Sequence, residues 1–252
     1  MHETFGNEIV TTGERKQRIS QVFSLVAGRY DLMNDLMSFG IHRLWKRAMV
    51  ADLKLAKTAI VIDLAGGTGD VARAIQRKTG HSPLVIDASW KMMVAGREKD
   101  AAAAINKTIN WTAGEGENLP LADNSVDLVT LSFGLRNMTN IESCLAEILR
   151  CLKPGGQLIC LEFSTPLFWL KPFYDAYSRF VIPRLGAFVA REPAAYQYLV
   201  ESIRKFPNQQ ELCNIFDQTG FTDVSYKNLS FGISALHYGT KQPANSKTRT
   251  AP

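Results

Sequence analysis

The sequence contains little cysteine, and its cysteines are not closely paired. Four cysteines occur in 252 residues, and none belongs to a Cys-x-x-Cys motif. They are Cys144, Cys151, Cys160 and Cys213. Disulfide scaffolds and cysteine-based zinc sites are built from cysteines at characteristic short spacings. We therefore expect reduced thiols in the core of a cytoplasmic protein, with no disulfide and no bound metal.

Long hydrophobic runs are absent as well. The apolar run at 185–190, one of the longest, is far shorter than the roughly 18 residues needed to cross a bilayer. Residues 1–17 are polar and of mixed charge, unlike a signal peptide or an obvious transit peptide. These absences predict a cytoplasmic chain that does not span a membrane.

Acidic residues are outnumbered by basic ones. The chain has 24 Asp and Glu against 29 Lys and Arg, which gives a formal net charge of +5 at pH 7. A positive balance favours anionic partners, either nucleic acid or phospholipid, although a moderate excess of lysine also serves solubility. Net charge alone does not decide between these partners.

The order of apolar runs predicts an α/β fold. Strand-like runs at 59–64, 83–88, 127–133 and 156–163 alternate with helical stretches at 69–79, 89–104 and 139–152. Such alternation is typical of a doubly wound, mostly parallel sheet with helices on both faces. The last two runs, 221–230 and 231–241, are joined too closely for a crossover helix, so we expect them to pair antiparallel.

The two ends of the chain differ from this core. Residues 1–18 are interpreted as loose chain, and apolar residues recur at helical spacing over 19–56, with a break near Gly40. The final residues, 242–252, are interpreted as a disordered basic tail. The length is compatible with a single domain.

A glycine-rich turn follows the first predicted strand. Asp63 lies inside that strand, Gly66, Gly67 and Gly69 form the turn, and Asp87 ends the next strand 20 residues after Gly67. The spacing satisfies the dinucleotide fingerprint, so an NAD-dependent oxidoreductase stays open. A carboxylate at Asp63 suits an ammonium group and gives nothing to a pyrophosphate. Either aspartate could instead cap a turn, and a tight turn alone also requires the glycines.

Two further motifs point to a known family when taken with this turn. The stretches DLAGGTGD, LPLADNSVDLV and LKPGGQLICLEF occur in this order. Together they resemble the S-adenosylmethionine-dependent methyltransferases of the seven-strand type. The resemblance implies a seven-stranded sheet whose last strand is antiparallel. It also implies that Asp63 supports the amino group of S-adenosylmethionine, that Asp87 accepts hydrogen bonds from its ribose, and that 115–117 flank its adenine.

Longer blocks narrow the resemblance. The stretches at 22–47, 131–140, 161–166, 174–186, 196–207 and 228–241 resemble the ubiquinone/menaquinone biosynthesis C-methyltransferases. Members of that family methylate a ring carbon of a polyprenylated benzoquinol or of demethylmenaquinol. The cofactor positions that the resemblance implies, beside Asp63 and the glycines, are Thr68, Asp87, Glu115, Gly116 and Ser132.

The implied reaction makes demands on the acceptor. A ring carbon attacks a methyl group only when an adjacent hydroxyl donates electrons, so the reduced quinol, preferably as its phenolate, should be the substrate. Arg136 follows the strand predicted at 127–133, at the sheet edge where such folds bind ligands. We predict that Arg136 stabilises the phenolate, directly or through a water, and that Asn137 orients the same oxygen. The alternatives are a salt bridge from Arg136 to a helix end and a helix cap by Asn137.

Aromatic residues gather after the fifth predicted strand. Residues 163–206 hold eleven of the twenty-four aromatics, interleaved with six Lys and Arg. This composition predicts a helical, aromatic insertion that forms an apolar tunnel for a polyprenyl tail, rimmed by positive charge. An additional layer of core would have the same composition. The candidate quinol contacts are Tyr174, Tyr177, Tyr196 and His237, although His237 is also explained as a structural histidine.

The predicted organisation is one methyltransferase domain over 1–252. Its parts are a helical N-terminal cover (19–56), a cofactor-binding core (59–163), a substrate-covering insertion (164–206), a final helix and hairpin (207–241), and the tail (242–252). We expect peripheral association with an anionic membrane surface, here the inner membrane. A homodimer or a biosynthetic complex is left open.

Other functions remain as alternatives. Nucleic acid is not an expected partner, because the chain lacks both an Asn/Asp-Pro-Pro-aromatic tetrad and a Pro-Cys nucleophile. Methylation of another small lipophilic phenol would use the same residues. A non-enzymatic binding subunit with this fold is disfavoured, because the cofactor motifs and Arg136 are all present.

Overall fold

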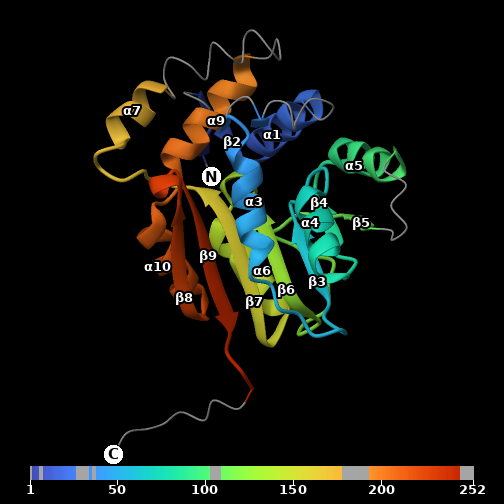
Figure 1. The fold of residues 1–252 in the computed structure, drawn as a ribbon. Helices are drawn as coiled ribbons and strands as arrows, with labels where there is room; N and C mark the ends of the chain where they lie inside the picture. The colour runs from blue at the N-terminus through green and yellow to red at the C-terminus, as the bar shows by residue number, and fades with distance from the viewer. Residues whose placement is uncertain are drawn as a thin grey trace, which may run out of the picture.

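The computed structural model describes residues 2–5, 8–26, 34–35, 38–102, 109–177 and 193–244. Within them a seven-stranded sheet has the order β5-β4-β3-β6-β7-β9-β8 (Figure 1). Its strands are β3 (Val61–Leu64), β4 (Leu84–Asp87), β5 (Asn110–Ala113), β6 (Val126–Ser132), β7 (Leu152–Phe163), β8 (Phe221–Leu229) and β9 (Ser234–Lys241). The fold prediction of a seven-stranded doubly wound sheet is confirmed.

The strand directions also agree with the sequence. Strands β3 to β7 pair parallel with their neighbours, whereas β9 pairs antiparallel with both β7 and β8. Parallel neighbours need long crossovers, which the intervening helices provide. The connection between β8 and β9 is only the short helix η4 (Ser230–Gly232), so these strands form a hairpin.

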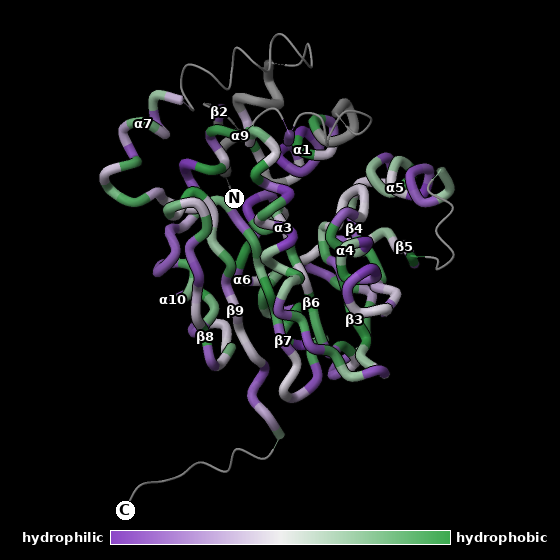
Figure 2. The backbone as a smooth tube through the Cα atoms, in the orientation of Figure 1, coloured by the Kyte–Doolittle hydropathy of each residue, from purple (hydrophilic) through white to green (hydrophobic). Residues whose placement is uncertain are grey.

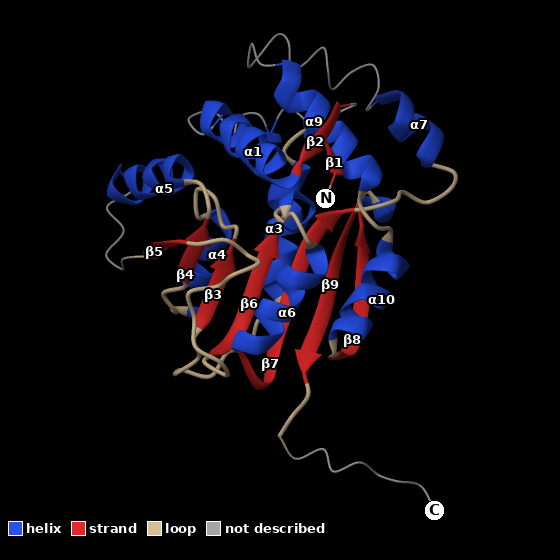
Figure 3. Ribbon diagram, turned by 180° about the vertical axis from the view of Figure 1, so that it is seen from behind, coloured by secondary structure: helices blue, strands red, loops and turns tan. Residues whose placement is uncertain are grey.

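Helices cover both faces of the sheet. Helices α3 (Ile41–Ala51) and α4 (Asp70–Thr79) lie in front of it in Figure 1, and α6 (Ile141–Cys151) and α10 (Gln209–Thr219) lie in front of it in the reverse view of Figure 3. One hydrophobic cluster joins α3 and α4 to the sheet, and a second joins α6 and α10 to it. Because both faces are covered, the central strands β3 and β6 are buried and apolar (Figure 2).

Further elements gather over the carboxyl ends of the parallel strands (Figures 1 and 3). They are β1 (His2–Phe5), β2 (Glu8–Thr11), α1 (Thr12–Val26), α7 (Lys171–Ala176) and α9 (Pro193–Lys205). In doubly wound folds this edge binds ligands, so the cover lies where a substrate would sit. Helix α5 (Trp90–Ala102) follows β4 at the side of the sheet.

The N-terminal prediction was wrong in one respect. The composition of residues 1–18 predicts loose chain, but β1 and β2 pair antiparallel and α1 already begins at Thr12. The Glu14 carboxylate accepts hydrogen bonds from the amide and hydroxyl of Thr11, and the Glu14 amide donates to that hydroxyl oxygen. This reciprocal pattern is a capping box, a helix-start signal visible as Thr-x-x-Glu.

Other boundaries differ in smaller ways. The predicted break near Gly40 is confirmed, because Gly40 has φ +73 and α3 begins after it. Strand β5 was not among the apolar runs, since it has four residues, two of them exposed. Strand β7 begins at Leu152, before the run predicted at 156–163, and its register with β6 shifts near this start. Residues 178–192 of the predicted insertion and 245–252 of the predicted tail lie outside the described residues.

Candidate functional site

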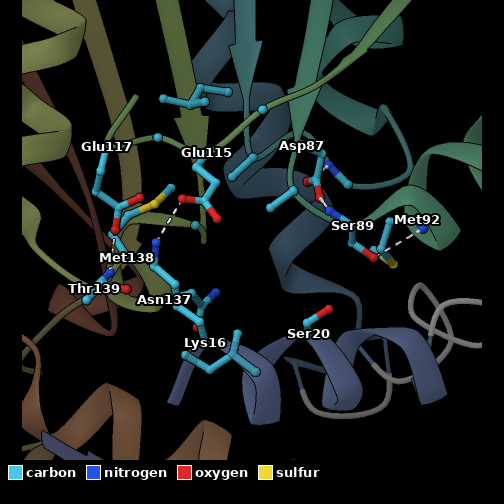
Figure 4. A pocket seen from close by; sticks show the side chains of 18 of the residues that line it. Lys16, Ser20, Asp87, Ser89, Met92, Glu115, Glu117, Asn137, Met138 and Thr139 are labelled. Atoms are coloured by element: carbon cyan, nitrogen blue, oxygen red, sulfur yellow. Dashed lines mark hydrogen bonds and ion pairs between the residues drawn. The ribbon is translucent and has the colours of Figure 1, made fainter. Parts of the chain in front are cut away.

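A cavity of about 360 Å³ opens where β3 has β4 on one side and β6 on the other. Chain crossovers leave in opposite directions from this point, which is where open α/β sheets bind ligands. Its walls come from the turn after β3, the ends of β4 and β5, the segment after β6, and α1. Figure 4 shows Lys16 and Ser20 of α1 on one side, facing Asp87 and Glu115 on the other.

The turn after β3 depends on glycine at two positions. Gly67 lines the cavity with φ +57, and Gly69 has φ +80 immediately before α4. Left-handed backbone is accessible to glycine without steric cost. A Cβ atom on Gly69 would also lie 2.6 Å from Cη2 of Trp111, so the turn packs tightly against β5. The turn can therefore bring bare backbone close to a ligand.

Asp87 connects this turn to the end of β4. Its Oδ2 accepts from the Gly67 amide at 2.8 Å, and its Oδ1 accepts from the Ser89 amide at 2.7 Å. Burial raises the pKa of this carboxyl group, and the two amide donors oppose the rise. Each carboxylate oxygen can accept more than one hydrogen bond, so Asp87 can still meet a diol in the cavity it lines.

Asp63 is placed differently from Asp87. It is completely buried, with Oδ1 accepting from the Thr130 hydroxyl at 2.9 Å and Oδ2 from the Ala72 amide at 3.0 Å. Burial raises its pKa to about 7. The described residues that line the cavity do not include Asp63. The side chain ties β3 to β6 and α4, and its contact with an amino group stays a prediction.

The remaining predicted cofactor positions fall into two groups. Glu115 and Gly116 line the cavity, and Glu115 also pairs with Lys16 of α1 at 2.8 Å (Figure 4). Gly66, Thr68, Gly69 and Ser132 are not among the lining residues of the described chain. The Ser132 hydroxyl is nevertheless buried and lacks a hydrogen-bond partner within the residues described.

A second cavity, of about 300 Å³, lies beside the first. Phe133 lines both cavities, so they share a wall. The apolar lining of the second cavity comprises Phe39, Ile41, Trp45, Phe133, Phe163, Leu170, Phe173, Tyr174, Tyr177, Leu199, Ile203 and Ile233. Its polar lining comprises Asn34, Ser38, His42, Arg136 and Ser230. A concave apolar site with a few polar groups is typical of small-molecule binding.

The wall between the cavities combines strained backbone with tilted, closely packed aromatic rings. Phe133 has φ +57, a conformation that a bulky residue rarely adopts. Its ring centroid lies 4.7 Å from that of Phe163 and 6.2 Å from that of Trp45. Strained residues persist where the surroundings hold them, and they cluster at functional sites.

The short helix η2 (Leu135–Asn137) follows Phe133 and serves both cavities. Arg136 lines the apolar cavity, and Asn137 lines the first cavity. The two residues predicted to be catalytic therefore lie at the junction of the cavities. This juxtaposition suits transfer of a group from a ligand in one cavity to a ligand in the other.

Arg136 is part of a buried ion pair. Its Nη1 donates to the Phe133 carbonyl at 2.6 Å and to Glu162 Oε2 at 2.9 Å, and the Glu162 side chain is fully buried. Burial raises the pKa of Glu162, and the adjacent guanidinium opposes the rise. The alternative of a salt bridge is thus realised, with a residue of β7 and not with a helix end. Nε of Arg136 is buried without a partner in the described chain.

Asn137 does not cap the following helix. The cap of α6 is Asn140, whose side chain accepts from the Ser143 amide at 2.6 Å. Asn137 instead accepts from the Tyr198 hydroxyl at 3.0 Å and donates to the Phe133 carbonyl at 3.3 Å. The side-chain amide is held at the cavity wall by these two bonds.

The predicted quinol contacts divide into three cases. Tyr174 and Tyr177 line the apolar cavity, and burial raises the pKa of Tyr174 to about 12, which keeps its phenol neutral. The side chain of Tyr196 lies outside the described residues. The contact of His237 with the quinol stays a prediction, and its surroundings favour the alternative of a structural histidine. His237 lies on β9 with Nε2 against the Gln209 carbonyl at 3.1 Å and its ring 6.1 Å from Phe216, and it lines neither cavity.

The sequence reasoning missed the contribution of two N-terminal helices. Lys16 and Ser20 of α1 line the first cavity, and Ser38, His42 and Trp45 line the second. His42 and Trp45 are three residues apart, the spacing of one helix face, and Ser38 lies just before this helix, on the other side of the break at Gly40. From the sequence, residues 19–56 are interpreted only as helices that pack on the core. The histidine and the serine in this segment could have indicated polar groups at a binding site.

Comparison with known proteins places the chain in a family. The model of the ubiE/COQ5 methyltransferase family matches residues 11–241. The chain belongs to the ubiE/COQ5 methyltransferase family. A protein of Rubrivivax gelatinosus named ubiquinone/menaquinone biosynthesis C-methyltransferase is 51% identical over 251 residues, covering 100% of this chain and 98% of that protein.

A second relative and a solved structure are also similar to this chain. The mitochondrial 2-methoxy-6-polyprenyl-1,4-benzoquinol methylase of Caenorhabditis elegans is 47% identical over 244 residues, covering 94% of this chain and 84% of that one. A Haloferax volcanii putative methyltransferase, solved with the Trm112 activator, superposes with a TM-score of 0.63 at 18% identity. The superposition covers 87% of this chain and 97% of that chain. At this identity the likeness shows the fold alone.

Proposed function

We propose that this ubiE/COQ5 family member is an S-adenosylmethionine-dependent C-methyltransferase. It methylates a ring carbon of a polyprenylated quinol in the biosynthesis of menaquinone, ubiquinone or both. The observation that carries the proposal is the pair of cavities that share Phe133 as a wall. One has the glycine turn and acidic residues suited to the cofactor, and the other is apolar and suited to a lipid-like ring.

The first cavity fits S-adenosylmethionine, which supplies an activated methyl group on a sulfonium. Its volume of about 360 Å³ lies within the roughly 300–1,000 Å³ of ligand sites. The bare backbone at Gly67 suits the methionine part, and Asp87 suits the two ribose hydroxyls. We expect Glu115 and Gly116, which line the same cavity, to flank the adenine. The buried, unpartnered hydroxyl of Ser132 is available to a ligand or a water at this edge.

The second cavity fits an aromatic acceptor with an isoprenoid tail. Rings from Phe133, Phe163, Tyr174 and Tyr177 form part of its largely apolar wall, so burial of apolar surface holds the acceptor. Methyl transfer is an in-line displacement, and the protein's main contribution is to hold the ring carbon about 3 Å from the methyl group. The shared wall at Phe133 brings the two ligands together.

Arg136 supplies the electrostatics of the acceptor site. A phenol with a pKa near 10 costs roughly 4 kcal/mol to ionise at pH 7. A guanidinium beside the oxygen reduces this cost without a strong base, in a site where the surrounding rings exclude water. Glu162 holds the Arg136 guanidinium from the sheet side. The Nε atom of Arg136 makes no hydrogen bond within the described chain.

Quinones extracted from cells that lack the gene test this function. A demethylated quinone should accumulate, because the methylation step is blocked, and its head group identifies the natural acceptor. Expression of the parent chain should restore the methylated quinone, whereas an Asp87→Ala variant with impaired cofactor binding should not. Normal quinones in the deletion strain would contradict the proposal.

We further infer that the protein associates peripherally with an anionic membrane on its cytoplasmic side. The aromatic rim, defined as Phe39, Phe168, Trp169, Phe173 and Phe231, consists of exposed side chains; Phe168 is 86% exposed and Phe173 is 72% exposed. Phe39 and Phe173 also line the apolar cavity, and the Phe231 ring lies 5.2 Å from that of Trp169. Interfacial aromatics near a lipid-binding mouth suit a membrane surface.

The basic side chains around the rim support the same inference. Arg43 and Lys171 are half-exposed and adjoin the rim in sequence, each in an ion pair with an aspartate, and the chain carries a net charge of +5. Positive charge near the surface attracts anionic lipid. In the part of the chain that the structure describes, none of the helices is long and apolar enough to cross a membrane. A homodimer or a biosynthetic complex stays a prediction.

Vesicle flotation tests the rim. The parent should float with vesicles that contain phosphatidylglycerol and bind vesicles of phosphatidylcholine alone less well. Replacing both Phe168 and Trp169 by serine should reduce flotation at least about fivefold, because exposed apolar anchors are lost. Ile60→Ser is the matched control, since Ile60 is exposed before β3, at the other edge of the sheet. Equal flotation of parent and double variant would contradict the membrane face.

A further inference from the structure

His42 lies in the first turn of α3 and contributes a polar atom to the apolar cavity. The proposed function gives this atom no role. Its side chain is 4% exposed, and it lines the cavity together with Arg136. A buried histidine in an apolar site needs partners for both ring nitrogens, because an unpaired polar atom is costly there. The two nitrogens of His42 have different surroundings.

The hydrogen bonds around Nδ1 determine where the ring proton sits. The Ser38 hydroxyl donates to the Asn34 carbonyl at 2.7 Å, and it has only one proton to give. The 2.8 Å contact between Ser38 Oγ and His42 Nδ1 must therefore have Nδ1–H as the donor. Asp35 Oδ1, at 3.9 Å from Nδ1, further favours a proton on that nitrogen.

The charge state follows from the groups around the ring. Burial and then the cations Lys46 and Arg43 lower the pKa of His42, against the opposing effect of Asp35 and Asp70, and the result is a pKa of about 4. The ring is therefore neutral at pH 7. A neutral ring with Nδ1–H carries a lone pair on Nε2, so Nε2 can accept a hydrogen bond and cannot donate one.

The Nε2 atom is open to the cavity. It makes no hydrogen bond to the residues that the structure describes, and it is not among the fully enclosed side-chain atoms without a partner. Because Nδ1 is bound to Ser38, in the segment just before α3, Nε2 is the polar atom that His42 presents to a ligand.

We propose that His42 Nε2 accepts a hydrogen bond from a hydroxyl of the acceptor ring and thereby selects the reduced quinol over the oxidised quinone. The proposal rests on the proposed function. A quinol O–H donates to Nε2, whereas a quinone carbonyl would place its lone pairs against that of Nε2. Arg136 cannot make this distinction, since its N–H groups can donate to a hydroxyl, a phenolate or a carbonyl oxygen.

The arrangement also suits a 1,4-quinol, which carries oxygens at opposite ends of the ring. One oxygen can meet Arg136 and the other His42, because both residues line the same cavity. His42 moves no proton in this scheme. It positions the ring and makes the oxidised form bind poorly, so the enzyme does not hold an acceptor whose carbon is electron-poor.

Equilibrium binding of one probe in two redox states tests the proposal. The probe is a short-chain demethylmenaquinone, oxidised or reduced anaerobically with dithionite. We expect the parent to bind the quinol at least about tenfold more tightly than the quinone, the scale of one hydrogen bond made against one replaced by repulsion. His42→Phe should bring this ratio close to one by weakening the quinol alone.

Two further variants separate recognition from packing. His42→Gln should regain quinol binding and also bind quinone, because an amide can accept or donate. Ser38→Ala leaves the ring in place but frees its tautomer, so quinone affinity should rise while quinol affinity stays. His81→Phe is the matched control, since His81 bonds Thr79 and the Ala56 carbonyl and lines neither cavity.

The outcomes are distinguishable. If the parent methylates the quinol and His42→Phe keeps the parent's quinol-to-quinone ratio, the proposal is overturned and the proposed function stands. If His42→Phe does not fold, an unchanged ratio in Ser38→Ala overturns the proposal by itself. If the parent neither binds nor methylates the quinol, the proposed function fails and this proposal fails with it.

Discussion

At the scale of single residues, Arg136 combines two roles that usually exclude each other. A guanidinium fully engaged by a buried carboxylate is structural, yet this one also lines an apolar cavity beside the cofactor site. Glu162 contacts Nη1, and Nε stays without a partner in the described chain, so the pair orients the group without exhausting its donors. Glu162 is therefore the positioning residue for Arg136.

Substitution of Arg136 tests the electrostatic role. Arg136→Ala should reduce turnover by about 10²-fold or more, the range for losing one stabilising donor. Arg136→Lys should recover part of the rate, because the charge survives without the planar fork. Raising the pH should help the Ala variant more than the parent, since solvent then supplies the phenolate. Steady-state rates between about pH 7 and 9, below the pKa of an ordinary phenol, measure these effects.

Stability must be followed in the same variants. Removing one partner of a buried ion pair costs about 3–5 kcal/mol, so Arg136→Ala is paired with an Arg136→Ala, Glu162→Gln double variant that leaves no uncompensated charge. Cofactor affinity should barely change, because Arg136 lines the acceptor cavity. Loss of cofactor binding in a folded variant would contradict the assignment and leave Arg136 a structural residue.

The site residues that could be identified from the sequence are those whose positions follow from the spacing within one short motif. Gly67 and Asp87 follow from one turn and one strand end, and both line the first cavity. The surroundings of His237 could not be predicted, because neighbouring residues of a strand face opposite sides: Leu236 packs with α3 and α4, whereas His237 contacts α10. The partner of Arg136 could not be predicted, since Glu162 lies 26 residues away on another strand.

At the scale of elements, the unit of β3, its glycine turn and α4 is held by Asp63. The carboxylate receives the Ala72 amide of α4 and the Thr130 hydroxyl of β6 while completely buried. Desolvation dominates these two bonds, so the pKa rises to about 7. In the unfolded chain the same group has a pKa of about 3.9.

This difference predicts a pH-dependent contribution to stability. Between about pH 4 and 7 the folded state holds a proton on Asp63 that the unfolded state has released, so stability falls as pH rises through this window, by up to about 4 kcal/mol. His42 and His237, whose pKa values are lowered to about 4, act in the opposite direction. The contribution must therefore be isolated by comparing parent with Asp63→Asn.

Urea unfolding on either side of the folded pKa, at about pH 5 and about pH 7.5, makes that comparison. The free energy of unfolding of the parent, relative to Asp63→Asn, should be higher at the lower pH, because the amide that replaces the carboxyl group cannot titrate. A difference that is the same at both pH values would show that Asp63 does not change its protonation on unfolding.

The predictability of each element depended on its length and pattern. Long periodic segments such as α4 and α6 were placed within two residues, and the break before α3 was marked by Gly40. Strand β5 was missed because it is a short edge strand with exposed side chains. The start of α1 was missed although Thr11 and Glu14 carry a capping box, because the polar composition of residues 1–18 was given more weight.

At the scale of the whole molecule, one edge of the sheet combines both cavities with the aromatic rim. The cofactor cavity lies over β3 and β4, the apolar cavity lies beside it across Phe133, and the rim residues Phe39 and Phe173 line the apolar cavity at the protein surface. Topology could be predicted from strand–helix alternation. The pairing of cavities could not, because α1, α3 and α7 reach the site only through tertiary packing.

The central claim is that the chain transfers a methyl group from S-adenosylmethionine to a ring carbon of a reduced quinol. The most direct measurement uses purified protein, methyl-labelled S-adenosylmethionine and a short-chain demethylmenaquinone or methoxy-prenyl-benzoquinone, either oxidised or reduced anaerobically. Mass spectrometry locates the label in the product. The account predicts a carbon-methylated ring with the reduced acceptor and none with the oxidised one. Equal rates on quinone and quinol, or a label on oxygen, would contradict it.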